Sequence, residues 1–202
     1  MATSRTLSTA DARRATVVAS AVTTFARGGY QGTTIADVAE QAAISPAYVS
    51  KLYTKAALFV AALDECYERI LSSLEAGAAE AGADATPAEV LHAMGGAYAA
   101  LLADRDLLML QVHAQAATVE PLILDAVRRG IARVTDYART RSRATNPEVQ
   151  QFIAFGQLCH LLTTIDAFGV DAAWAKALTT GVRHAALKRK PRRTSRLEGD
   201  ER

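Results

Sequence analysis

Residues 15–59 read ATVVASAVTTFARGGYQGTTIADVAEQAAISPAYVSKLYTKAALF, and this stretch decides the fold. In its first third, valine, phenylalanine and alanine recur every three or four positions, which is the spacing of one buried helix face. We predict a helix over about 9–28, and Gly28-Gly29 should stop it, because glycine is the residue that most readily leaves the helical conformation.

Two short helices are predicted next. The first spans about 34–41 and begins with Thr34 and Asp37, whose spacing is that of a capping box. The second spans about 46–53 and follows Ser45, which stands before a proline and makes a strong start signal. Two short helices joined by three or four residues have the spacing of a helix-turn-helix.

The same 45 residues resemble the DNA-binding domain of the TetR (tetracycline-repressor-like) family of bacterial transcription regulators. The resemblance rests on Phe25, Gly29-Tyr30, Thr33-Thr34, the box from Ile35 to Ala39, Ile44-Ser45 and Thr54-Lys55 with Leu58. It implies a two-fold homodimer that binds double-stranded operator DNA. It also implies a repressor that is released from its operator when a small-molecule effector binds to the C-terminal domain, and the sequence does not give the identity of this effector.

The DNA contacts are expected on the outward face of the second short helix and at neighbouring helix starts, where free backbone N–H groups attract phosphate. Tyr48 and Lys51 are the side chains best suited to bases and phosphates. The candidates are Thr33, Thr34, Ser45, Pro46, Ala47, Tyr48, Ser50, Lys51 and Lys55. Helix capping alone also explains the threonine and serine positions, and solvent exposure also explains the lysines.

Three positions depart from the family pattern. Ala43 stands where glycine is usual, and we expect the left-handed turn there to cost about 1 kcal/mol. The link between Tyr53 and Thr54 lacks a customary proline or glycine. Ser50 occupies a position where the family often has a phosphate-contacting tyrosine.

The remaining chain also predicts helices, so the fold class is all-α with about nine helices. The further helices are expected over about 55–80, 87–103, 105–117, 120–142, 147–168 and 171–188. We expect residues 1–54 to form the DNA-binding domain, 55–188 the ligand-binding and dimerisation domain, and 189–202 a disordered basic tail.

Charge and composition narrow the class of protein. The 202 residues carry a formal net charge of +2 and include 43 alanines, a composition that favours helix. Residues 1–60 are net basic and residues 61–182 net acidic, which fits a polyanion-binding head on a different body. Two cysteines without a C-x-x-C pattern suggest a reducing compartment. Neither a membrane span nor a signal peptide is indicated, so we expect a cytoplasmic protein.

The predicted helices 147–168 and 171–188 should form the dimer interface, since the first is apolar almost all round. Burial within a monomer is the alternative. The interface candidates are Leu158, Leu161, Leu162, Ile165, Trp174, Leu178, Gly181 and Val182. The candidate effector pocket contains Met94, Tyr98, Met109, His113, Phe152, Phe155 and Cys159, although a plain core explains these residues too.

Enzyme chemistry is not indicated. The sequence has no nucleophile elbow, phosphate-binding loop or dinucleotide fingerprint. Its four histidines show no metal-ligand spacing, so no catalytic residue, metal or cofactor is expected. The alternative function is a helical-bundle ligand-binding protein or enzyme without sequence-specific DNA binding.

Overall fold

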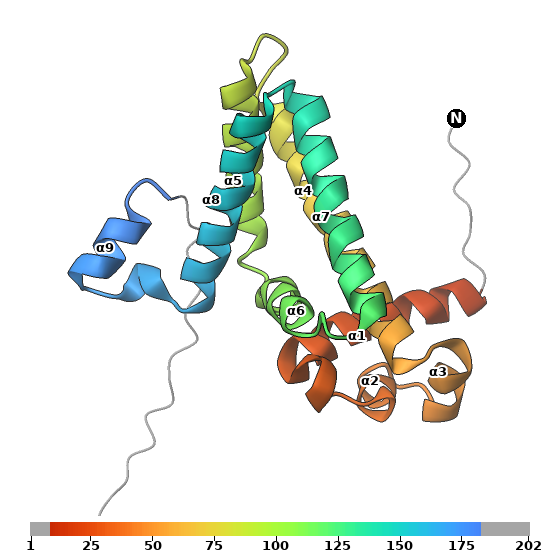
Figure 1. The fold of residues 1–202 in the computed structure, drawn as a ribbon. Helices are drawn as coiled ribbons and strands as arrows, with labels where there is room; N and C mark the ends of the chain where they lie inside the picture. Colours follow the sequence, from red (N-terminus) through yellow and green to blue (C-terminus); the bar gives the residue numbers. More distant parts are fainter. Residues whose placement is uncertain (1–8, 183–202) are drawn as a thin grey trace, which may run out of the picture.

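The computed structural model describes residues 9–182, and this part of the chain contains nine α-helices, one short 3-10 helix and no strand (Figure 1). The all-α class is therefore confirmed. The elements are α1 (Thr9–Gly32), α2 (Ile35–Gln41), α3 (Pro46–Leu52), α4 (Lys55–Glu80), α5 (Pro87–Leu101), α6 (Arg105–Ala116), α7 (Pro121–Ser142), α8 (Asn146–Thr164), η1 (Ala167–Gly169) and α9 (Ala173–Thr179).

Local chemistry sets most helix starts. Three helices begin with a threonine whose backbone N–H donates to a carboxylate three residues later, and the pairs are Thr34–Asp37, Thr86–Glu89 and Thr145–Glu148. Four helices have proline in the first turn, where the missing N–H costs no hydrogen bond. The capping prediction for Thr34 is confirmed.

The last two predicted helices are shorter than expected. The helix predicted over 147–168 ends at Thr164, because Asp166 takes a left-handed conformation with φ of 54°. The helix predicted over 171–188 ends at Thr179, before Gly181 with φ of 77°. Residues 183–188 and the predicted tail lie outside the described part of the chain.

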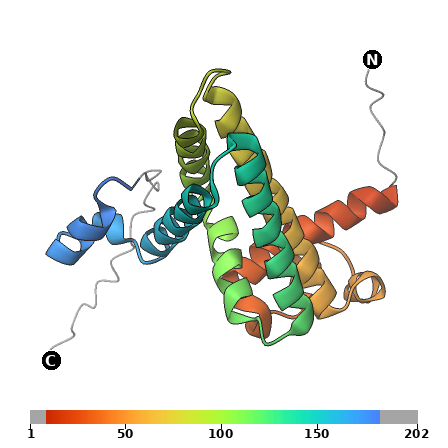
Figure 2. The same cartoon turned by 45° about the horizontal axis from the view of Figure 1, so that its top comes forward.

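The body has two arms that converge at one end and spread toward the other (Figures 1 and 2). One arm is α4 with α7, the other is α5 with α8, and α6 crosses the open base. Two glycines permit close packing: a methyl group at Gly77 of α4 would lie 2.7 Å from the carbonyl oxygen of Ala93, and one at Gly130 of α7 would overlap the Tyr67 ring. The arms are therefore held at short helix–helix distances around α4.

The head consists of α1, α2, α3 and the start of α4, and lies below the base of the body (Figure 1). Its core is fully buried and includes Phe25, Val38, Val49 and Phe59. The Phe25 and Phe59 rings meet edge to face with centroids 4.9 Å apart, a favourable aromatic geometry. Within residues 9–182, no helix combines the length and hydropathy that crossing a bilayer requires.

Candidate nucleic-acid interface and effector site

The helix predicted to read DNA, α3, is held by one buried contact and presents its other side outward. Val49 is fully buried, whereas Ala47, Ser50 and Lys51 are exposed. Ser45 caps the helix, because its hydroxyl accepts the Tyr48 N–H at 3.3 Å. Tyr48 is half-buried, and the exposed Pro46 forms the first turn. This arrangement leaves one polar helix face free for a major groove.

The α2–α3 turn contains the alanine that replaces the usual glycine. Ala43 has φ of 54°, so it adopts the left-handed conformation that the sequence predicted for this position. Its exposed side chain meets no steric barrier from the core. The residue keeps the helix-turn-helix geometry at a local conformational cost.

Two of the candidate DNA-binding residues have internal roles. The Thr33 side chain is 1% exposed and lies against Gly28, so its prediction as a surface contact is wrong for the side chain. Lys55 is half-buried; its Nζ donates to the carbonyl oxygen of Gln31 at 3.3 Å and lies 4.8 Å from the centroid of the Tyr30 ring. Lys55 therefore ties α4 to the end of α1.

Tyr30 belongs to the junction between head and body. Its ring meets Phe59 of α4 edge to face at 5.4 Å. Partial burial raises the pKa of the Tyr30 phenol, and the charge of Glu120 and its hydrogen bond with Tyr30 add to this effect. Glu120 precedes α7 in the chain, so Tyr30 connects the end of α1 to the loop between α6 and α7.

His113 marks a second contact at this junction. Gly29 is buried and interrupts α1 with φ of 67° and ψ of 179°, a conformation that is essentially reserved for glycine. A methyl group at Gly29 would come within 2.9 Å of the His113 Nδ1. The last turn of α6 therefore packs directly on the point where α1 bends, and His113 serves this contact.

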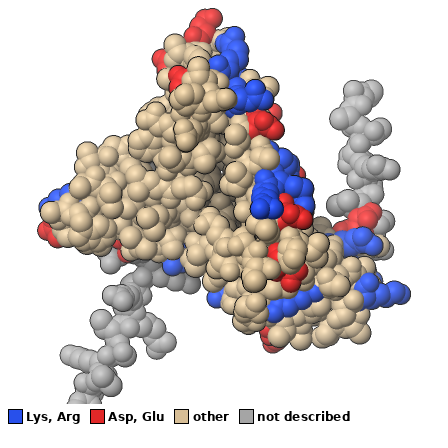
Figure 3. Space-filling view, in the orientation of Figure 1, with Lys and Arg blue, Asp and Glu red and all other residues tan. Residues whose placement is uncertain are grey.

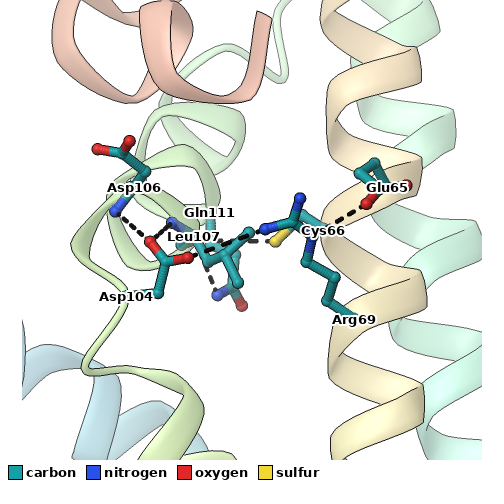
Figure 4. Close-up of polar contacts among 7 residues, drawn as sticks. All are labelled: Glu65, Cys66, Arg69, Asp104, Asp106, Leu107 and Gln111. Atoms are coloured by element: carbon teal, nitrogen blue, oxygen red, sulfur yellow. Dashed lines mark hydrogen bonds and ion pairs between the residues drawn. The ribbon is translucent and has the colours of Figure 1, made fainter. Parts of the chain in front are cut away.

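The other end of α6 is attached to α4 (Figure 4). Asp104 caps α6 by accepting the N–H of Asp106 at 3.0 Å, and Arg69 of α4 lies 3.9 Å from the Asp104 carboxylate. The Gln111 amide donates to the Leu107 carbonyl oxygen at 3.1 Å. Gln111 also accepts the Tyr98 hydroxyl of α5 at 3.2 Å, so α6 contacts α4, α5 and the head.

A hollow of about 460 Å³ lies between α5 and α8. We call it the α5–α8 groove, and it is lined by Ala88, Leu91, His92, Gly95, Gly96, Tyr98, Ala99, Glu148, Gln151, Phe152, Phe155, Gly156, Cys159, Gly181 and Val182. A far smaller cavity of about 40 Å³ lies between α4 and α8, and Tyr67 and Gln111 are among the residues that line it. Tyr98, Phe152 and Gly156 border both spaces.

The groove brings together four of the seven predicted pocket residues: Tyr98, Phe152, Phe155 and Cys159. The other three do not line it. Met94 is fully buried in the core, and Met109 packs partly buried against the same core. The sequence missed the glycines that open the groove, although Gly95-Gly96 within a predicted helix was the available signal.

The cysteines and buried histidine are chemically quiet. Burial raises the pKa of the Cys66 thiol to about 12 and also raises that of Cys159. Burial lowers the pKa of His160, whose Nε2 lies 3.1 Å from the carbonyl oxygen of Leu108. Within residues 9–182, no cluster of three metal-ligating side chains occurs.

The exposed apolar side chains of α8, η1 and α9 form a surface that we call the apolar face. It is the surface on which the dimer interface is expected. Its members are large apolar side chains that are 39–52% exposed, and they are Phe155, Leu161, Ile165, Val170, Trp174 and Leu178. Figure 3 shows few charged side chains over these elements. Of the other interface candidates, Gly181 is exposed, while Leu158 and Val182 are half-buried. Leu162 was also predicted to lie in the dimer interface, but it is fully buried within the monomer and is not part of the apolar face.

The fold and the exposed α3 define a helix-turn-helix head on a helical body. No model of a protein family matches the sequence, and no curated protein matches it. Solved structures do match. A TetR-like transcriptional regulator from Rhodococcus sp. RHA1 has a TM-score of 0.61 at 21% identity, with 87% of this chain and 95% of that chain covered.

Two further solved structures contain a ligand. The transcriptional regulator FadR from Bacillus subtilis in complex with stearoyl-CoA has a TM-score of 0.64 at 16% identity, covering 83% of this chain and 96% of that one. The multidrug binding protein EbrR complexed with imidazole has a TM-score of 0.61 at 19% identity, covering 86% and 97%. The chain therefore has the TetR-family fold, as the resemblance of residues 15–59 predicted.

Proposed function

We propose that this protein is a DNA-binding transcriptional regulator that acts as a homodimer and is controlled by a small molecule. The observation that carries the proposal is the presentation of α3: one buried valine holds the helix, and its polar side faces solvent. The structural neighbours are transcriptional regulators rather than enzymes, which supports the same function. We propose no catalytic role and no cofactor.

DNA contacts are assigned to the outward residues of α3 and to the start of α2. Tyr48 and Lys51 are the side chains that can reach bases or phosphates, with Pro46, Ala47 and Ser50 beside them. Thr34, at the exposed start of α2, places a hydroxyl where phosphate binds helix N-termini. Ser45 supports α3 through its cap, and Lys55 ties α4 to the end of α1 through the Gln31 contact.

The dimer is assigned to the apolar face. Two-fold assembly covers the same patch on both subunits and supplies two recognition helices for the two halves of an operator. The exposed Trp174 and Leu161 are suited to such an interface, since aromatic and large apolar residues dominate interface cores.

The effector is assigned to the α5–α8 groove, and its binding should release the protein from DNA. Two of the structural neighbours contain ligands, stearoyl-CoA in one and imidazole in the other, which supports a ligand site in this fold. Tyr98 borders the groove and donates to Gln111 of α6. Since His113 of the same helix packs on Gly29, a shift of α6 on ligand binding acts on the head, and the effector needs only to bind the shifted state more tightly.

Operator binding of the purified full chain tests the function. An operator is first selected from random DNA duplexes, and its affinity is then measured by fluorescence anisotropy over a salt series. Tyr48→Ala and Lys51→Ala should each weaken binding by about 1–3 kcal/mol, or 5–150-fold, if they contact bases, and Lys51→Ala should flatten the salt dependence if it contacts phosphate. Arg139→Ala, in the last turn of α7 at the end of the body opposite the head, is the matched loss of a charge (Figure 1).

Selection that enriches no duplex, or equal affinity of the wild type and both α3 variants at fixed salt, would reject the assignment. A helical-bundle ligand-binding protein without DNA recognition would then be the better description. Circular dichroism of every variant shows that the fold is retained.

A further inference from the structure

The shape of the α5–α8 groove restricts what it can hold. Two helices border it, from Ala88 to Ala99 on α5 and from Glu148 to Cys159 on α8, a length of about 16 Å at the helical rise. Gly181 and Val182 also line the groove. The space therefore suits an elongated molecule rather than a compact one.

Glycines open the groove, although helix packing does not require them. A methyl group at Gly95 would make only an ordinary contact with the Phe152 ring, at 3.8 Å, and one at Gly156 would do the same with Tyr98. Glycine inside a helix costs about 1 kcal/mol relative to alanine. Each glycine therefore weakens its helix but leaves free volume in the groove. We call the part of the groove formed by Gly95 and Gly156 the glycine floor.

The walls beside this floor are aromatic. Phe152 and Phe155 of α8 and Tyr98 of α5 all border the groove. Aromatic rings offer broad apolar surfaces to a flat ligand, and their electron-rich faces also attract cations. Phe155 is 52% exposed in the single chain and also belongs to the apolar face assigned to the dimer, so Phe152 and Tyr98 are the rings that the groove does not share with that face.

Among the described residues that line the groove, no lysine or arginine occurs, Glu148 is the one acidic residue, and His92 is the one imidazole. Hydrogen bonds from Thr145 lower the pKa of the Glu148 carboxyl, so the group is ionised at neutral pH. A bound anion would therefore face the Glu148 carboxylate and no lysine or arginine of the described lining, whereas a cation would gain both the carboxylate and the aromatic faces.

We propose that the α5–α8 groove binds an elongated, flat, apolar organic cation, with its apolar body on the glycine floor and its positive charge toward Glu148. The proposal rests on the proposed function only in treating this groove as the effector site. It excludes fatty acids and other anionic chains as good ligands of the groove.

Two dyes with the same flat xanthene body test the charge preference. Rhodamine 6G is a cation and fluorescein an anion, and both report binding to the full chain by fluorescence anisotropy without DNA. We expect rhodamine 6G to bind at least 30-fold more tightly. Glu148→Gln should weaken it about three- to tenfold, since glutamine keeps the helix cap but removes the charge. Glu89→Gln makes the same change at the start of α5, outside the groove lining, and should change affinity less than twofold.

A second variant tests the location. Gly95→Leu fills the floor, and leucine is favourable in helices, so the protein should stay folded while rhodamine 6G binding falls at least tenfold. Equal binding of the two dyes, failure of rhodamine 6G to bind, or unchanged binding to Gly95→Leu would each overturn the proposal. Rhodamine 6G binding only to a monomeric variant would assign the groove to the second copy of the chain and overturn it too.

The operator measurement separates this proposal from the function. Operator binding without rhodamine 6G binding would reject the ligand class and leave the regulator intact. Charge-selective dye binding at the groove without operator binding would reject the regulator and leave the ligand class.

Discussion

Gly29→Ala should be among the most damaging single substitutions in the head. Its φ of 67° with ψ of 179° is a region essentially reserved for glycine, and an alanine methyl group would also lie 2.9 Å from the His113 Nδ1. The backbone strain costs about 1–3 kcal/mol, and the crowding adds about 1 kcal/mol. We expect a loss of ~2–4 kcal/mol in the free energy of unfolding.

A double-mutant cycle separates these two costs. His113→Ala removes the ring that a methyl group at Gly29 would meet, but it leaves the backbone conformation unchanged. In the background of His113→Ala, the Gly29→Ala substitution should therefore cost about 1 kcal/mol less than in the wild type. This coupling measures the contact between α6 and the head directly.

Urea unfolding followed by circular dichroism gives the four stabilities of the cycle, and operator anisotropy gives the four affinities. Gly32→Ala is the control, because no atom lies within 4 Å of a methyl group there. Its stability should change by less than about 0.5 kcal/mol. Additive costs in the cycle, or a Gly29→Ala variant as stable as Gly32→Ala, would refute the packing of His113 on the α1 bend.

Three further predictions concern other regions. Ala43→Gly should stabilise the protein by about 1 kcal/mol in chemical unfolding, because Ala43 has φ of 54°; a loss of stability would contradict this. Leu161→Glu should give a monomer in sedimentation, whereas Leu122→Glu, an equally exposed site on α7, should leave the dimer; a dimeric Leu161→Glu would exclude the apolar face. Burial lowers the pKa of His160 in the folded protein, so the unfolded chain binds a proton on this imidazole more tightly. The stability that the neutral His160 contributes is therefore fully present above about pH 6.5 and is lost as the pH falls through the folded-state pKa. His160→Gln should flatten the pH dependence of the unfolding free energy between pH 7 and 5, and an unchanged slope would show that His160 does not titrate there.

The head was predictable because its signals are local. Capping pairs, a serine–proline start and a glycine stop act within one turn, so the sequence places α2, α3 and the start of α4 within one or two residues of their observed positions. The left-handed turn at Ala43 was predicted from the family pattern and is confirmed. These features depend on backbone chemistry and not on distant packing.

The site in the body was only partly predictable, because it depends on which helix faces meet. An apolar residue on α8 can face the core, the groove or solvent, and Leu162, Phe155 and Leu161 differ in this way. The sequence also gave no sign that His113 would meet Gly29, since the contact joins residues more than 80 positions apart. Helical periodicity identifies an apolar stripe but not the partner that covers it.

The glycine contacts around α4 limit how the head can swing. Gly77 fits against Ala93 and Tyr67 fits against Gly130, so the upper part of α4 has almost no room to tilt independently of α5 and α7. The segment from Lys55 to Tyr67 lies beyond both contacts and is about 18 Å long at the helical rise. A bend of about 10° at Tyr67 would move the head by about 3 Å, and in the proposed two-fold dimer the two heads together would move by about 6 Å against a half-site spacing of about 34 Å. A small bend at the contact between Tyr67 and Gly130 would thus be enough to change the spacing of the two α3 helices, so that it no longer matches one turn of the DNA.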